Sequence, residues 1–78
     1  MSKLIRQRDN LTKEGTIEFV EFDKNNRGKD IHMSPKVGYA CIVNRTLLSY
    51  HWMTSIITEV ISQTEFKTKN SHYKIEIN

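Results

Sequence analysis

Seventy-eight residues, 37% of them hydrophobic and 27% charged, form a chain long enough for one small domain. This mixture is too apolar for a disordered protein, and no apolar run approaches the ~20 residues that a membrane-spanning helix needs. The net charge of +3 permits an acidic partner without requiring one.

The cellular location follows from two further features. The first ten residues carry charges with no apolar stretch behind them, so we expect no secretory signal. The chain has one cysteine, Cys41, whereas a small secreted domain usually carries several. We therefore expect a cytoplasmic protein that does not associate with membranes, in which Cys41 is a small buried side chain.

Residues 1–15 show little periodicity and end at Gly15. We expect an N-terminal arm here, formed either by one short helical turn or by a loose, mobile segment, because chain termini are often mobile. Residues 16–78 carry several short β-prone runs separated by turn-forming residues. We expect this part to fold as a single small β-barrel domain.

Residues 16–23 alternate at first, with Ile17 and Phe19 on one face, and the apolar phase then shifts to Val20 and Phe22. This pattern predicts a strand with either a β-bulge or a strand end at the shift, because one inserted residue moves the following side chains to the opposite face. If this strand is exposed, two copies of the chain could pair through it. The oligomeric state therefore stays open, with a homodimer among the alternatives.

Residues 24–35 are rich in turn-forming residues and predict a long loop. Long loops in compact domains often carry function, so the basic side chains of Lys24, Arg27 and Lys29 are candidates for contact with a partner. The loop begins like a calcium-binding loop, but Arg27 stands where an oxygen ligand is required. The continuous β-prone run over residues 37–43 predicts the next strand.

Residues 47–53 alternate and place Leu48, Tyr50 and Trp52 on one face of a predicted strand. Tyr50 and Trp52 are therefore candidates for stacking on bases or for anchoring a protein partner. The alternative is that Trp52 belongs to the core of the domain, where a single tryptophan is usually found.

Residues 53–62 are ambiguous between a strand and a short helix, because four apolar side chains also fit a helical spacing. These residues are Ile56, Ile57, Val60 and Ile61. All four are β-branched, and such side chains are stiff in a helix but pack well on a pleated sheet. We therefore predict a strand.

Residues 66–77, FKTKNSHYKIEI, predict a C-terminal β-hairpin that turns at Asn70 and Ser71. The expected cross-strand pairs are Phe66 with Ile75, Lys67 with Lys74, Thr68 with Tyr73, and Lys69 with His72. One face is then apolar, and the other opposes groups of like charge, which destabilises a sheet by up to ~1 kcal/mol per pair. The lysines would either meet an acidic partner or, alternatively, extend into water and protect the strand from unwanted pairing.

The long first loop, the short later turns and the terminal hairpin resemble an SH3-like small barrel. The segments Trp52-Met53-Thr54-Ser55-Ile56 and Thr68-Lys69-Asn70-Ser71-His72-Tyr73 are similar to short proteins encoded by bacteriophages and other mobile elements. This resemblance extends over residues 37–77. It implies a small accessory protein that acts in the host cytoplasm by binding and inhibiting a host macromolecule, for example a defence or transcription component.

These features predict an all-β protein, a barrel of about five or six strands with a C-terminal hairpin. We expect it to be non-enzymatic and to bind a host protein or protein complex without a cofactor or metal ion, because the histidines and glycines are too dispersed for zinc or phosphate motifs. The alternative is a small nucleic-acid-binding barrel in which lysines contact phosphates and Tyr50 or Trp52 stacks on bases. The candidate partner-binding residues are Lys24, Arg27, Lys29, Tyr50, Trp52, Lys67, Lys69, His72 and Lys74.

Overall fold

The computed structural model describes residues 2–25, 27–46 and 50–77, and within these ranges the secondary structure is entirely β. The strands are β1 (Ser2–Arg6), β2 (Leu11–Gly15), β3 (Ile17–Phe22), β4 (Gly28–His32), β5 (Ala40–Val43), β6 (Trp52–Ser62), β7 (Glu65–Thr68) and β8 (His72–Ile77). The predicted all-β class is confirmed, although the strands are more numerous than expected. In the described part of the chain, no helix has the length and apolar character to cross a membrane.

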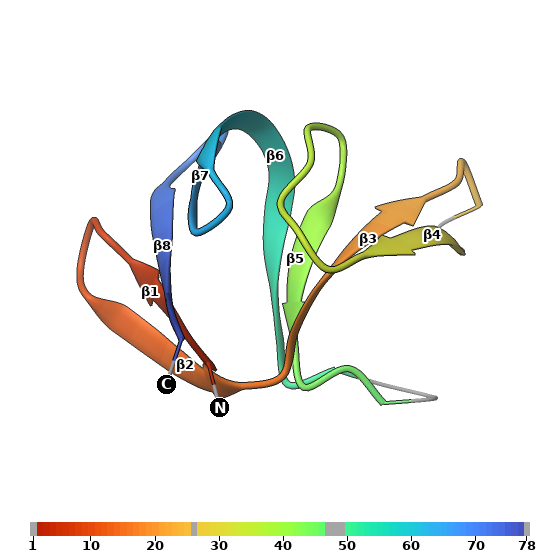
Figure 1. Ribbon diagram of the computed structural model, residues 1–78. Helices are drawn as coiled ribbons and strands as arrows, with labels where there is room; N and C mark the ends of the chain where they lie inside the picture. The colour runs from red at the N-terminus through yellow and green to blue at the C-terminus, as the bar shows by residue number, and fades with distance from the viewer. Residues whose placement is uncertain (1, 26, 47–49, 78) are drawn as a thin grey trace.

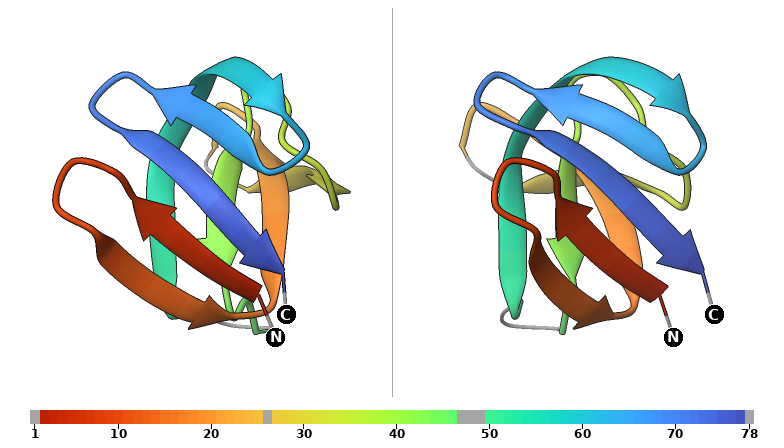
Figure 2. Two further views of the ribbon diagram at one scale, coloured as in Figure 1. Left: turned by 60° about the vertical axis from the view of Figure 1, so that its left-hand side comes forward. Right: turned by 90° about the vertical axis from the view of Figure 1, so that its left-hand side faces the viewer.

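The eight strands form one antiparallel sheet in the order β2-β1-β8-β7-β6-β5-β3-β4. Strand β6 curves over the top of the molecule and connects the half that contains β7, β8 and β1 to the half that contains β5 and β3 (Figures 1 and 2). Irregularities in its pairing with β5 and β7 accompany this curvature, as expected because β-bulges increase local twist. The edge strands β2 and β4 are not paired with each other, so the expected barrel is not closed.

In place of the arm expected over residues 1–15, the described residues 2–15 form β1, a turn and β2. Strand β1 pairs with both β2 and β8, and Leu4 lies in the core. The side chain of Asp9 organises the turn between the two strands: it accepts hydrogen bonds from the Arg6 guanidinium at 3.0 and 2.7 Å and from the Leu11 N–H at 3.2 Å. Asn10 adopts a positive φ of 58°, which asparagine tolerates better than most residues.

The strand predicted over residues 16–23 is confirmed as β3, but Phe19 and Val20 pair regularly with His32 and Ile31, so there is no bulge at the expected phase shift. The register with β4 shifts between Glu21 and Phe22 instead. The long loop predicted over residues 24–35 is wrong in part, because Gly28–His32 forms β4. Asp23 shortens the connection, since its Oδ1 accepts hydrogen bonds from the N–H groups of Asn25 and Arg27 at 2.8 and 3.0 Å. This turn lets the polar sequence of β4 fold back onto β3.

The run predicted over residues 37–43 yields the shorter strand β5, and residues 53–62 form a strand, as predicted, within β6. The backbone of Cys41 on β5 donates a hydrogen bond to the Thr54 side chain on β6 at 3.0 Å. Burial raises the pKa of the Cys41 thiol, consistent with its expected role as a small core residue. Leu48, part of the face predicted over residues 47–53, lies outside the described residues.

The core lies between the two halves of the curved sheet. Phe66 is at its centre, with its ring 5.7 Å edge-on from that of Phe19 and 5.3 Å from the stacked ring of Tyr73. The other members of this cluster are Leu4, Ile17, Tyr39, Cys41, Val43 and Ile57. These side chains come from both halves, so the same contacts hold the curvature of the sheet.

The C-terminal hairpin is confirmed, but its predicted register is wrong by two residues. Phe66 pairs with Tyr73 instead of Ile75, and Lys67 pairs with His72 instead of Lys74. The Thr68 N–H donates to the Ser71 carbonyl at 2.8 Å, which closes the turn one residue earlier than a turn centred on Asn70 and Ser71 would. Because the shift is even, the predicted inward and outward faces are unchanged.

Candidate partner-binding groove

Strands β3 and β5 bury side chains on both of their faces, although only one face meets the central core. Ile17 and Phe19 belong to that core, whereas Val20 faces the opposite side and is still only 3% exposed. Ala40 and Ile42 of β5 are likewise buried outside the core cluster. The outward face of this half of the sheet therefore carries a second apolar layer.

The register of the strands aligns this layer into a row across four strands. Ile31 of β4 pairs with Val20 of β3, Val20 pairs with Ala40 of β5, and Ala40 pairs with Ile56 of β6. The two inner members are buried, whereas Ile31 and Ile56 at the ends of the row are 45% and 46% exposed. An apolar surface thus continues from the buried layer to solvent on both sides.

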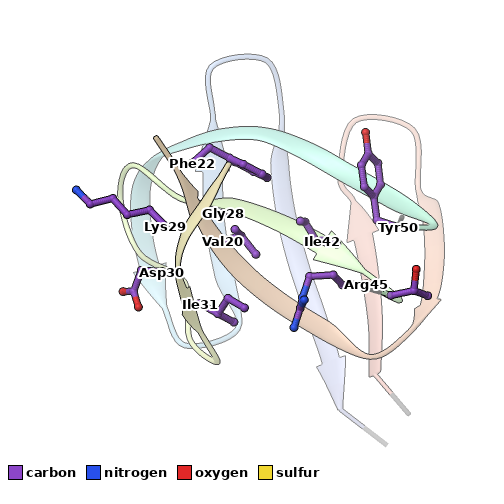
Figure 3. Close-up of a pocket in the computed structure, with 10 residues that line it drawn as sticks. Val20, Phe22, Gly28, Lys29, Asp30, Ile31, Ile42, Arg45 and Tyr50 are labelled. Atoms are coloured by element: carbon purple, nitrogen blue, oxygen red, sulfur yellow. The ribbon is translucent and has the colours of Figure 1, made fainter. Parts of the chain in front are cut away.

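A groove of about 700 Å³ lies over part of this layer (Figure 3). Figure 3 shows Lys29 and Asp30 on the β4 side of the groove, and Arg45 and Tyr50 on the side of the connection between β5 and β6. Its lining residues are Val20, Phe22, Gly28, Lys29, Asp30, Ile31, Ile42, Arg45, Thr46 and Tyr50. The groove therefore combines an apolar floor with cationic and aromatic side chains at its rim.

The rim cations differ in how firmly they are held. Arg45 makes a two-pronged contact with Glu18, with Nε 3.1 Å from Oε1 and Nη2 3.3 Å from Oε2. This geometry fixes the guanidinium over the sheet. Lys29 is 65% exposed and its Nζ lies 4.0 Å from Oε1 of Glu21, which is a weak surface contact. Lys29 is consequently free to reorient toward a bound partner.

Strand β4 is fastened to the domain by Tyr39, which precedes β5. The Tyr39 hydroxyl donates a hydrogen bond to Oδ2 of Asp30 at 2.5 Å. This bond is the main reason that the pKa of Tyr39 is raised to about 12 and the pKa of Asp30 is lowered. The Tyr39 ring also contacts His32 edge-on at 5.7 Å and lies 5.4 Å from the Lys36 ammonium. Although all of its residues are exposed, β4 is thereby held in place.

Two of the predicted partner-binding residues meet at this groove. Lys29 and Tyr50 were predicted from separate segments, and the fold places both in the groove lining. Lys24 and Arg27 are exposed in the turn between β3 and β4. Trp52 does not join them. It packs against the core, 6.0 Å from the Tyr73 ring and beneath the Arg6 guanidinium at 5.8 Å, which agrees with the alternative expected for it.

The hairpin lysines lie in a surface of mixed charge. Lys67 is paired with Glu59 of β6 on one side and with His72 of β8 on the other, and Lys74 is paired with Glu65. Nε2 of His72 lies 2.5 Å from Oε2 of Glu65. The predicted opposition of Lys67 to Lys74 is therefore wrong, and Lys69 stands apart in the exposed turn.

The sequence interpretation missed the floor of the groove and much of its rim. The missed residues are Val20, Phe22, Gly28, Asp30, Ile31, Ile42, Arg45 and Thr46. A signal for Val20 and Phe22 was present, because the apolar phase shift in this strand puts large side chains on both faces. The continuous apolar run through Ile42 likewise indicates burial on both faces.

The part of the chain that the structure describes holds no group of three or more His, Cys, Asp or Glu side chains arranged to bind a metal ion. Comparison with protein-family models, with curated proteins and with solved structures finds no match for this chain.

Proposed function

We propose that this chain is a non-enzymatic binding protein whose target is another protein, and that it holds the target in the groove on β3, β4 and β5. The observation that carries this proposal is the second apolar layer, which is buried beneath the groove and emerges at Ile31, on the side of the groove opposite Tyr50 (Figure 3). Tyrosine and arginine at the edge of an apolar pocket are typical of the residues that dominate protein–protein binding energy.

The energetics favour an apolar or aromatic side chain of the target as the group that enters the groove. Moving a side chain of that size from water into an apolar site contributes about 1.5–3 kcal/mol. Arg45 is already positioned by Glu18, so little side-chain entropy is lost when a target group packs against it. The groove thus offers a pre-organised site for an anchor residue.

The resemblance to short phage-encoded proteins supports a more specific form of the proposal. In that form the target is a host macromolecule in the host cytoplasm, and the chain inhibits it by occupying a functional surface. Small proteins of this kind act by binding, which agrees with a site built from apolar, aromatic and cationic side chains.

The alternative function, nucleic-acid binding, relies on the lysines of the C-terminal hairpin. Their interleaving with Glu59 and Glu65 reduces the positive potential that phosphate binding needs. The groove therefore supports protein binding better than the hairpin supports phosphate binding.

The experiment that tests the proposal is affinity capture from bacterial lysate with nuclease treatment, using three forms of the tagged chain. These are the native sequence, the groove variant Ile31→Asp, and the control Lys67→Gln/Lys74→Gln. Ile31 is half exposed, so an aspartate at this position should weaken the binding of an apolar group without removing a side chain from the core. We expect a stoichiometric protein that survives nuclease, is lost from Ile31→Asp and is retained by the control. The alternative would be supported instead if the native chain captured nucleic acid and if this binding were lost at higher salt and in Lys67→Gln/Lys74→Gln.

A further inference from the structure

We propose that the partner supplies an extended segment, which binds as an additional strand on the free edge of β4, next to the groove. This inference rests on the proposed function and identifies the form of the partner. Its basis is the difference between the two edges of the sheet, the direction of the backbone at Ile31, and the side chains around that residue.

The two edge strands of the sheet are not equally available for pairing. At the β2 edge, the Asn44 side chain accepts a hydrogen bond from the Thr16 N–H at 3.0 Å and donates one to the Glu14 carbonyl at 3.3 Å. Strand β4 pairs with β3 alone, and each of its residues is exposed. Unpaired N–H and C=O groups on such an edge are a template for another strand. Because the Asn44 side chain occupies the Glu14 end of β2, strand β4 is the more available of the two edges.

Hydrogen-bonded and non-hydrogen-bonded pairs alternate along an antiparallel ladder, which fixes the direction of each peptide group. Next to the β3–β5 ladder, the Asn44 N–H donates to the Thr16 carbonyl at 2.8 Å. That bond makes Thr16 and Asn44 a hydrogen-bonded pair, and every second pair along the ladder is of the same kind. Val20 and Ala40 are therefore also a hydrogen-bonded pair, and the N–H and C=O of Val20 point toward β5. Consistently, the Cys41 N–H points away from β3 and donates to Thr54.

Ile31 is paired with Val20 on the other side of β3. Because Val20 directs its peptide groups toward β5, Val20 and Ile31 form a non-hydrogen-bonded pair. The N–H and C=O of Ile31 therefore point to the free edge of the sheet. Tyr39 already holds the neighbouring Asp30 and His32, so the edge is ordered before a partner arrives.

The side chains around Ile31 define the chemistry of the added segment. Successive side chains of a strand alternate between faces, so every second residue of the segment would lie beside Ile31 and the groove. An apolar residue fits there. At the nearby turn, neither the Lys24 ammonium nor the Arg27 guanidinium lies within 4.0 Å of a carboxylate oxygen among the residues the structure describes. The segment should therefore be extended, apolar at alternate positions, and acidic at the end near this turn.

The test selects binders from a displayed library of random peptides of about twelve residues on the immobilised full-length chain. The recovered peptide is titrated against the native protein and against Ile31→Ala and Ile31→Pro. Both variants lose the isoleucine side chain, but only proline removes the N–H that faces the edge, and proline is tolerated at such positions. We expect alternating apolar residues in the peptide, and binding to Ile31→Pro ~10-fold weaker than to Ile31→Ala.

Amide hydrogen exchange in the native protein gives a second measurement that does not depend on how the proline variant folds. The Ile31 amide should exchange rapidly in the free protein and slowly with the selected peptide bound. Equal affinities for Ile31→Ala and Ile31→Pro, an Ile31 amide that stays unprotected, or selected peptides without alternation would each overturn edge pairing. If edge pairing is overturned but the Ile31→Asp variant does not bind the selected peptide, the groove remains the binding site. If Ile31→Asp binds normally, the proposed function itself fails.

Discussion

Asn44 connects the two halves of the sheet at the point where β2 leads into β3. Its backbone has a positive φ of 55°, and its side chain contacts the Glu14 carbonyl and the Thr16 N–H. A Cβ atom on Gly15 would lie only 2.1 Å from Oδ1 of Asn44, so glycine is required at that position. The side chain of one residue thus joins the end of one strand to the start of the next.

Replacing Asn44 by alanine should destabilise the domain more than the same change at Asn10. Asn10 has nearly the same positive φ, 58°, so both variants pay a similar backbone cost. Only Asn44→Ala also loses two hydrogen bonds to the β2–β3 junction, which adds about 1–2 kcal/mol. Urea unfolding of both variants measures the difference. Equal losses would show that the Asn44 side chain does not stabilise the junction.

The carboxyl group of Asp9 makes the stability of the folded domain depend on pH in the acidic range. Its hydrogen bond from Arg6, supported by the Leu11 N–H, lowers the pKa of the carboxyl group from 3.8 to about 2. Between these values the unfolded chain binds more protons than the folded one, so stability decreases as the pH falls from about 4 to 2. The contribution is complete above about pH 4.

We expect the thermal midpoint of Asp9→Asn to fall less steeply than that of the native protein between pH 4 and 2. Asparagine cannot titrate, so the acid-dependent contribution of this residue is removed. Asp30, whose pKa is also lowered, remains in both proteins and accounts for part of the remaining slope. Parallel midpoint curves for the two proteins would contradict the role assigned to Asp9.

At the scale of elements, the register of β6, β7 and β8 decides the electrostatics of the outward hairpin face. With Lys67 beside Glu59 and Lys74 beside Glu65, opposite charges alternate across the strands. In the register expected from the sequence, Lys67 would oppose Lys74. The two registers therefore predict changes in stability of opposite sign when the charge at residue 67 is reversed.

Changing Lys67 to Glu should destabilise the protein by a few tenths of a kcal/mol up to ~1 kcal/mol, because the new carboxylate faces Glu59. The matched control is Lys69→Glu, which lies in the exposed turn and should change stability little. Chemical unfolding at low salt gives both values. A gain in stability for Lys67→Glu would support the register with Lys67 opposite Lys74.

The strands that could be predicted are those with strong side-chain patterns, namely β3, β5, β6 and the C-terminal pair. Strand β4 escaped prediction because its sequence, GKDIH, is polar and its order depends on the Asp23 turn and the Tyr39 contact. The hairpin register escaped because Thr68 closes the turn with its own backbone and hydroxyl, which the charge pattern does not reveal.

The candidate site was predictable only in part. Lys29 and Tyr50 were identified as separate candidates, but their proximity depends on how β4 and the β5–β6 connection flank β3 and β5. The residues of the groove floor were harder to predict, because the sequence does not distinguish a residue such as Ile42 from a residue of the central core. Only the pairing of strands shows that it faces away from the core.

At the scale of the whole molecule, the central core accounts for most of the stability, whereas the outward apolar layer forms the proposed binding surface. A domain of this length is stabilised by about 4–12 kcal/mol in total. Phe66→Ala should remove about 3–5 kcal/mol, a large part of that stability, because Phe66 is fully buried between Phe19 and Tyr73. Phe22→Ala should cost less, since Phe22 is half-buried in the groove lining.

Circular dichroism on heating distinguishes the two phenylalanine variants. We expect Phe22→Ala to keep a thermal midpoint near the native one and to lose affinity for the captured partner, whereas Phe66→Ala should have a much lower midpoint. A cooperative transition near the native midpoint for Phe66→Ala would show that the core is not centred on this residue.

The most direct test of the central claim is hydrogen-exchange mass spectrometry of the native chain with and without its captured partner. The claim that the groove face binds the target predicts that the partner slows exchange over residues 28–32 and 44–46. Slower exchange confined to residues 65–76 would contradict it and would locate binding on the C-terminal hairpin.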